Sequence, residues 1–115
     1  MQDKCFLIVR SEPTEDRMLE EYHRWYEAHI RDLLQVPGVS AAKRFESLEG
    51  DMRYMAMYEM DDIKVFSSPE YKAVGRFGTM QSHLRFTRNV YREIPISGFA
   101  ETFRFGNKFP EGRND

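Results

Sequence analysis

The fold of this chain is decided by the run Tyr22-His23-Arg24-Trp25-Tyr26-Glu27-Ala28-His29-Ile30-Arg31-Asp32-Leu33-Leu34, which is soon followed by Val36-Pro37-Gly38-Val39. At about 100° per residue, its side chains separate into an apolar and aromatic face and a charged face, so the run predicts an amphipathic helix. Proline disfavours helical geometry in the residue before it, and glycine accepts a left-handed conformation. The helix is therefore expected to end near Val36, and a strand to begin at Val39.

The inner face of this predicted helix carries a histidine among aromatic residues. The face comprises Met18, Leu19, Tyr22, Trp25, Tyr26, His29, Ile30, Leu33 and Val36. A titratable group in a core needs a partner or a function. Two interpretations of His29 stay open: a general base or acid tuned near neutral pH, or a neutral core residue bonded to a backbone carbonyl or a nearby tyrosine.

The composition sets limits on the class of protein. The chain has 115 residues, of which 41% are hydrophobic and 14% aromatic, which suits one domain with a modest core. Its net charge of -2 and the lack of a basic block argue against nucleic acid as a partner. The single cysteine, Cys5, predicts a reducing, cytoplasmic location without an intramolecular disulfide. No segment approaches the roughly 18 apolar residues of a membrane helix, so we expect no membrane partner.

The remaining segments predict an alternation of strands and helices. Residues 4–10 form an apolar run expected to be a buried strand, and Pro13 is expected in the first turn of the following helix. Residues 39–48 and 53–60 predict a hairpin around the turn Glu49-Gly50-Asp51. Broken helical pieces follow, namely a short helix through Phe66, residues 70–76 and residues 80–84. A fourth strand is expected over residues 86–94.

This order predicts an α+β domain of the ferredoxin-like β-α-β-β-α-β type, with an antiparallel sheet covered on one face by two helices. The first strand is apolar on both sides, with Cys5, Leu7 and Val9 opposite Phe6 and Ile8. A single sheet would expose its second face, so a twofold homodimer in which two sheets close on each other is expected. The domain is expected over residues 1–105, where residues 96–105 form an extra strand or an arm on the partner subunit, and residues 106–115 form a polar tail.

The sequence resembles the dimeric α+β barrel superfamily, and specifically its EthD-like branch. The resemblance rests on Trp25-Tyr26-x-x-His29-x-x-Asp32-Leu33-Leu34, Val36-Pro37-Gly38, Arg44-Phe45, Ser68-Pro69-Glu70-Tyr71 and Arg88-Asn89-Val90-Tyr91-Arg92. It implies a dimeric α+β barrel in which His29 faces a cleft between the first helix and the sheet. The superfamily contains cyclases, isomerases, quinol monooxygenases and haem-degrading enzymes, so the resemblance implies a fold and leaves the reaction open.

Several residues are candidates for the site around His29. Asp32, three residues on, would orient the imidazole or else lie in solvent. Tyr22, Trp25 and Tyr26 would line a pocket for a flat molecule, or else belong to the core.

The hairpin and the start of the fourth strand supply the other candidates. Tyr54, Tyr58 and Arg44 would stabilise an enolate or phenolate, or else form cross-strand contacts at the sheet edge. His83 would complete a pair with His29 across the cleft, or lie at the surface.

The sequence therefore predicts a small cytoplasmic enzyme that acts on an aromatic, polyketide-like or lactone-like molecule by cofactor-independent proton transfer. His29, Tyr54 and Arg44 are its predicted catalytic residues. No metal site is expected, because His23, His29 and His83 lack a tight acidic cluster. One alternative is a monooxygenase of the same fold that uses a quinol or haem, with His83 or His29 as iron ligand. Another is a dimeric binding protein without enzymatic activity.

Overall fold

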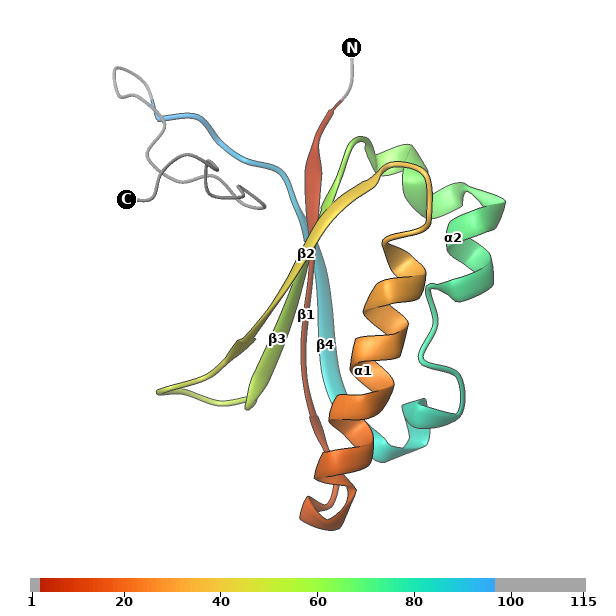
Figure 1. Ribbon diagram of the computed structural model, residues 1–115. Coiled ribbons are helices and arrows are strands. Elements are labelled where there is room, and N and C mark those ends of the chain that lie inside the picture. The colour runs from red at the N-terminus through yellow and green to blue at the C-terminus, as the bar shows by residue number, and fades with distance from the viewer. Residues whose placement is uncertain (1–2, 97–115) are drawn as a thin grey trace, which may run out of the picture.

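The computed structural model describes residues 3–96 of the chain (Figure 1). Its strands are β1 (Cys5–Pro13), β2 (Val39–Glu46), β3 (Tyr54–Met60) and β4 (Leu84–Tyr91). Its helices are α1 (Leu19–Leu33) and α2 (Pro69–Val74), and the short 3-10 helices are η1 (Asp16–Met18), η2 (Ile63–Ser67) and η3 (Gly78–His83). This is the predicted β-α-β-β-α-β order.

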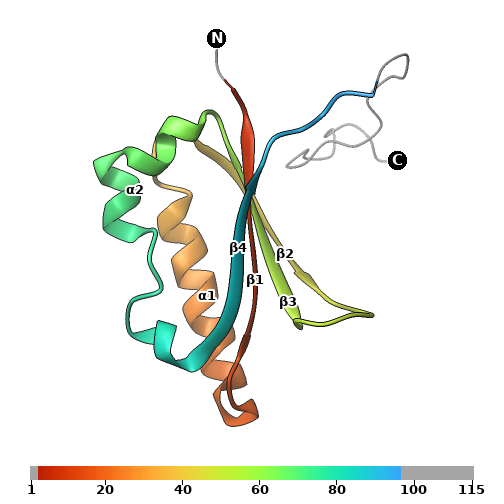
Figure 2. The same cartoon turned by 180° about the vertical axis from the view of Figure 1, so that it is seen from behind.

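The four strands form one sheet in the order β2-β3-β1-β4, and every neighbouring pair is antiparallel. The helices lie on one face of this sheet, and Figures 1 and 2 show that no helix of residues 3–96 lies on the other. The predicted α+β class, antiparallel sheet and one-sided helical layer are thus confirmed.

The core lies between the sheet and α1. Along β1, buried and half-buried residues alternate strictly, as do those along β3, because successive side chains of a strand point to opposite faces. The largest fully buried side chains include three tyrosines, namely Tyr22, Tyr26 and Tyr58. On the uncovered face, Phe6 and Ile8 of β1 are only half-buried within one chain, and the second face that the predicted dimer would cover is therefore open in the single chain.

The start of the first helix differs from the prediction. Pro13 is the last residue of β1, where it pairs with Leu84 of β4, and does not belong to the helix. A proline lacks the N–H that a strand interior needs, but the end of a strand tolerates it. The chain then passes through η1 before α1 begins at Leu19.

The strand β2 begins at Val39 as predicted, but α1 ends at Leu33, before the expected end near Val36, and a turn carries the chain through Pro37-Gly38 to β2. Gly38 has a φ of +95°, and a Cβ at this position would lie 2.5 Å from Cγ2 of Val65. Only glycine therefore combines the left-handed turn with the close approach of η2.

Two further expectations concern the ends of the sheet and the membrane. β4 begins two residues earlier than predicted and ends at Tyr91. Apart from Ile96, the predicted strand or arm of residues 96–105 lies outside the described residues, as does the predicted tail. Among residues 3–96 there is no helix with the length and apolar character needed to cross a membrane.

Candidate functional site

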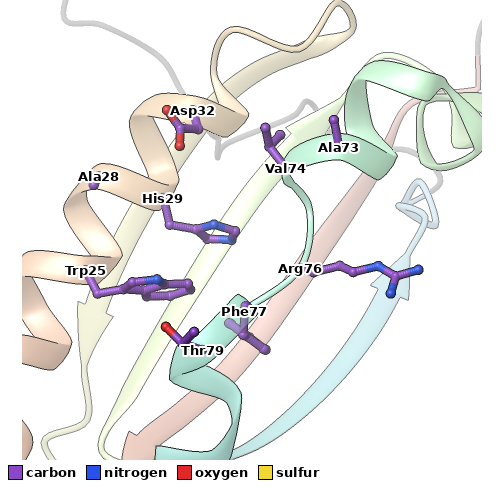
Figure 3. Close-up of a pocket in the computed structure, with 10 residues that line it drawn as sticks. Trp25, Ala28, His29, Asp32, Ala73, Val74, Arg76, Phe77 and Thr79 are labelled. Atoms are coloured by element: carbon purple, nitrogen blue, oxygen red, sulfur yellow. The ribbon is translucent and has the colours of Figure 1, made fainter.

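An open pocket lies between the C-terminal half of α1 and the segment that joins α2 to η3 (Figure 3). Its volume is about 360 Å³, which falls within the range of small-molecule sites. Helix α1 contributes Trp25, Ala28, His29 and Asp32, and the opposite wall is formed by Ala73, Val74, Arg76, Phe77, Gly78 and Thr79. The pocket thus includes three of the predicted site residues.

His29 projects from α1 into this pocket, as Figure 3 shows. Its ring stacks on Trp25, with centroids 4.5 Å apart and planes 16° apart, and it lies 6.0 Å from the ring of Phe77. No hydrogen bond to its ring nitrogens is present among the described residues. The interpretation as a core histidine bonded to a carbonyl or a tyrosine is therefore not supported by the described contacts.

The electrostatics of His29 keep its ring neutral. Burial lowers the pKa of His29 to about 4, and the nearby carboxylate of Asp32 opposes this shift. At neutral pH the imidazole therefore has a free lone pair. Asp32 acts through its charge, in the predicted i, i+3 relationship. Arg76 also lines the pocket, but Figure 3 shows its guanidinium directed away from His29.

Sequence reasoning missed the opposite wall of the pocket. Phe77 contacts Trp25, Tyr26 and His29 through its ring, yet it lies in an irregular segment without helical or strand periodicity. From the sequence, the glycines at positions 75 and 78 on either side of Phe77 indicate only a break between two helical pieces. Nothing in the local pattern indicates that this break folds back onto α1.

Arg44 lies in a second cluster, on the face of the sheet that α1 covers. Its guanidinium carbon is 4.8 Å from the ring centre of Tyr26, 5.6 Å from that of Tyr22 and 5.7 Å from that of Tyr54. These are cation–π distances. Its Nη2 atom is buried and has no hydrogen-bond partner.

The tyrosines around Arg44 differ in their hydrogen bonding. The hydroxyl of Tyr22 lies 2.6 Å from Oγ of Ser11, and this pair is buried. Burial raises the pKa of Tyr22, although Ser11 and Arg44 oppose the shift. Tyr54 packs against His23, whose ring centroid is 4.8 Å away. Because the guanidinium carbon of Arg44 also lies 5.7 Å from the ring centre of Tyr54, these two predicted residues are brought together. His23, which was not predicted to belong to the site, is their neighbour.

The predicted convergence of His29 with Arg44, Tyr54 and Tyr58 is not seen. The ring of Tyr26 lies between the two groups, 4.8 Å from the Arg44 guanidinium carbon and 6.0 Å from the His29 ring. Tyr58 is a core residue, only 1% exposed, and burial raises its pKa. A helix carries residues seven apart on one face but separates them by about 10 Å along its axis, so Tyr22 reaches the Arg44 cluster while His29 reaches the pocket.

His83 lies apart from both groups. It is the last residue of η3, half-buried, and its backbone carbonyl accepts a hydrogen bond from the amide of Thr14 at 2.9 Å. It does not line the pocket of His29, so the predicted pair across the cleft is not formed. Within the described part of the chain, no group of three or more His, Cys, Asp or Glu residues is placed to hold a metal ion.

Comparison with known proteins identifies solved structures that share this fold. No model of a known protein family matches the chain, and no curated protein matches it in sequence. Solved structures do match it. A proposed monooxygenase from Shewanella loihica PV-4 is 21% identical over 84% of this chain and 99% of its own, with a TM-score of 0.63.

Two other solved structures bear on the prediction. SnoaB, a cofactor-independent oxygenase from Streptomyces nogalater, is 11% identical over 84% of this chain and 99% of its own, with a TM-score of 0.65. An EthD-family protein from Bacillus halodurans is 17% identical over 81% of this chain and 100% of its own, with a TM-score of 0.58. The chain thus has the ferredoxin-like fold of the dimeric α+β barrel proteins, EthD-like proteins among them, as predicted. At these identities, the likeness concerns the fold alone.

Proposed function

We propose that this protein binds a flat, acidic organic molecule in the pocket of His29 and transfers a proton from it without a cofactor. The observation that carries this proposal is the neutral imidazole of His29, which lies in an open pocket without a hydrogen-bond partner among the described residues. Its lone pair would accept the proton. Asp32 and the face of Trp25 would both stabilise the imidazolium that forms.

The low pKa of His29 restricts the classes of substrate from which it can remove a proton. A base whose conjugate acid has a pKa of about 4 removes only protons that are already acidic. Phenols, β-dicarbonyl units of polyketide-like chains, and lactones activated by a second carbonyl meet this requirement. Trp25 and Phe77 offer ring surfaces that favour planar members of these classes. Cyclisation, isomerisation or dehydration would follow the same first step.

The test uses the single tryptophan of the chain as a binding reporter. A panel of phenols, β-dicarbonyl compounds and lactones is titrated while the fluorescence of Trp25 is recorded. Each β-dicarbonyl compound or lactone that binds is then incubated in D2O, and exchange of its acidic carbon-bound proton is followed by NMR. We expect exchange to be accelerated by the wild type and by His23→Gln, the matched control, and to be lost in His29→Gln. Full exchange in His29→Gln would contradict the proposal.

An oxygenase is the second candidate, and the structural likeness to SnoaB and to the Shewanella loihica protein favours it. After His29 removes a proton, an electron-rich carbanion would reduce O2. One oxygen atom would be bonded to the substrate carbon as a carbonyl, and the other would leave as water with the two hydrogens of that carbon. Incubation under ¹⁸O2 separates the candidates, because only the oxygenase places ¹⁸O in the product. Binding that shifts Trp25 fluorescence without either reaction would instead support a binding protein.

We further propose that the working form is a cytoplasmic homodimer joined through the uncovered sheet faces. Ile8 of β1 and Met57 of β3 pair across this face and are half-buried within one chain, and Phe45 of β2 is 40% exposed. Burying such a surface against its copy would remove it from water. The buried free thiol of Cys5 agrees with a reducing compartment.

A further inference from the structure

Arg44 differs from the other arginines of residues 3–96 in its pairing. Seven arginines lie within 4.0 Å of a carboxylate: Arg10, Arg17, Arg24, Arg31, Arg53, Arg85 and Arg92. Arg88 lies within reach of the hydroxyl of Tyr71, and Arg76 is exposed. Arg44 is half-buried, and no carboxylate pairs with it among residues 3–96.

The guanidinium of Arg44 interacts with the hydroxyl of Tyr22, but the aromatic rings around it do not satisfy its remaining donors. Tyr22, Tyr26 and Tyr54 attract the charge of the guanidinium through their faces, but a ring face is a weak acceptor for an N–H group. Nη2 is buried without any acceptor. A buried cationic donor without a partner is costly and rare in folded proteins, which indicates that a group absent from the chain itself completes the arrangement.

The surroundings of Arg44 favour an anion. Besides burial, the cations Arg44 and Arg53 both lower the pKa of His23, which packs against Tyr54 at the margin of the cluster. The carboxylates of Glu46 and Glu27 oppose this shift but act more weakly than the two arginines, so the net potential at His23 is positive. Arg44 belongs to β2, the edge strand of the sheet, so it lies at the side of the core and not at its centre.

We propose that Arg44 is the anchor of a second ligand site, which binds the carboxylate of an aromatic acid. A guanidinium offers two parallel N–H groups that match the two oxygens of a carboxylate, and the buried rings of Tyr22, Tyr26 and Tyr54 make the surroundings of that carboxylate aromatic and largely apolar. The ring of Tyr26 separates this site from the pocket of His29. The inference stands on Arg44 and holds whether or not His29 transfers a proton.

The test uses benzoate as the charged probe and benzamide as its neutral counterpart of the same shape. Each is titrated into ¹⁵N-labelled protein while the Nε–H resonance of the Arg44 side chain is followed by NMR. We expect benzoate to shift this resonance saturably and benzamide to leave it in place. The affinity for benzoate should fall at least tenfold in Arg44→Gln and less in Arg44→Lys, which keeps the charge but loses the paired donors. Arg24→Gln, an exposed arginine of α1 paired with Glu20, should bind as the wild type does.

Several results would overturn the proposal. Equal binding of benzamide and benzoate would show that charge is not recognised, and unchanged affinity in Arg44→Gln would show that Arg44 is not the anchor. Benzoate that changes the fluorescence of Trp25 and leaves the Arg44 resonance in place would be bound in the pocket of His29 instead. If Arg44→Gln does not fold, Arg44→Lys and the wild-type resonance still decide the question.

Discussion

The imidazole of His29 lies flat against the indole of Trp25, with ring centroids 4.5 Å apart and planes inclined by 16°. Since the chain has a single tryptophan, its fluorescence reports the state of His29 directly. We expect a fluorescence titration with a midpoint near pH 4, because burial lowers the pKa of His29 to about 4. His29→Gln should abolish this transition. A midpoint near the ordinary histidine value of about 6.5 would contradict the buried, neutral state.

The titration of His29 makes the free energy of unfolding depend on pH. The pKa of His29 is about 4 in the folded chain, against 6.5 for an unperturbed histidine, so between these values the unfolded chain binds more protons and stability falls as pH falls. The loss should approach ~3 kcal/mol at about pH 4 and then level off. The difference between wild type and His29→Gln in urea unfolding from pH 7 to pH 4 isolates this contribution from the titration of Asp32 and other carboxylates. If the unfolding free energies of the wild type and of His29→Gln change in parallel with pH, His29 makes no such contribution.

The hydrogen bond between Tyr22 and Ser11 ties α1 to β1 inside the core. Tyr22→Phe removes the hydroxyl and leaves Oγ of Ser11 buried, so we expect a loss of about 1 to 3 kcal/mol. Ser11→Ala should cost a similar amount. In the double variant the two losses should not add, because both single changes remove the same bond. Urea denaturation measures all three, and strictly additive losses would show that the bond contributes nothing.

Gly38 should tolerate no side chain. Gly38→Ala places a Cβ in the left-handed region, at a cost of about 1 to 2 kcal/mol, and against Cγ2 of Val65. Adding Val65→Ala should relieve the clash and leave the cost of the backbone conformation. Thermal unfolding of both variants and of Val65→Ala alone checks this. A Gly38→Ala protein as stable as the wild type would contradict the observed turn.

The sheet-face homodimer predicts a specific sensitivity to charge. Ile8→Lys and Met57→Lys place ammonium groups on paired positions of the uncovered face, and each should convert the dimer to monomers. Ile63→Lys is the matched control, because Ile63 is 53% exposed but lies in η2, away from that face. Sedimentation velocity distinguishes dimer from monomer. A wild type that sediments as a monomer, or dissociation in Ile63→Lys alone, would contradict the proposed interface.

Much of the fold follows from local chemistry. The periodicity around Tyr22 and Trp25 predicts a helix with one buried face, and the alternation of Tyr54, Ala56 and Tyr58 predicts a strand with the same property. Both are observed. Pro13 was placed wrongly because a proline suits both the first turn of a helix and the end of a strand. Only the pairing with β4 decides between these positions.

The candidate site was predictable only in part. His29, Asp32 and Trp25 share the pocket because helical spacing brings them to one side of α1, and this spacing can be derived from the sequence. Arg44 and Tyr54 meet because β2 and β3 form the predicted hairpin. Phe77 could not be predicted, since its irregular segment reaches α1 only through the path of the chain after α2.

The sequence by itself determined the element types, the split β-α-β-β-α-β order and the presence of a histidine on the buried face of the first helix, since these depend on periodicity and on residues close in the chain. The tertiary structure alone decided that His29 and Arg44 belong to different clusters. Arg44 lies between α1 and the sheet, whereas His29 faces the segment between α2 and η3 and not the expected cleft between α1 and the sheet. The ring of Tyr26 contacts both groups. Which side chain fills that space depends on how the helix lies across the strands, and no local pattern of residues specifies this.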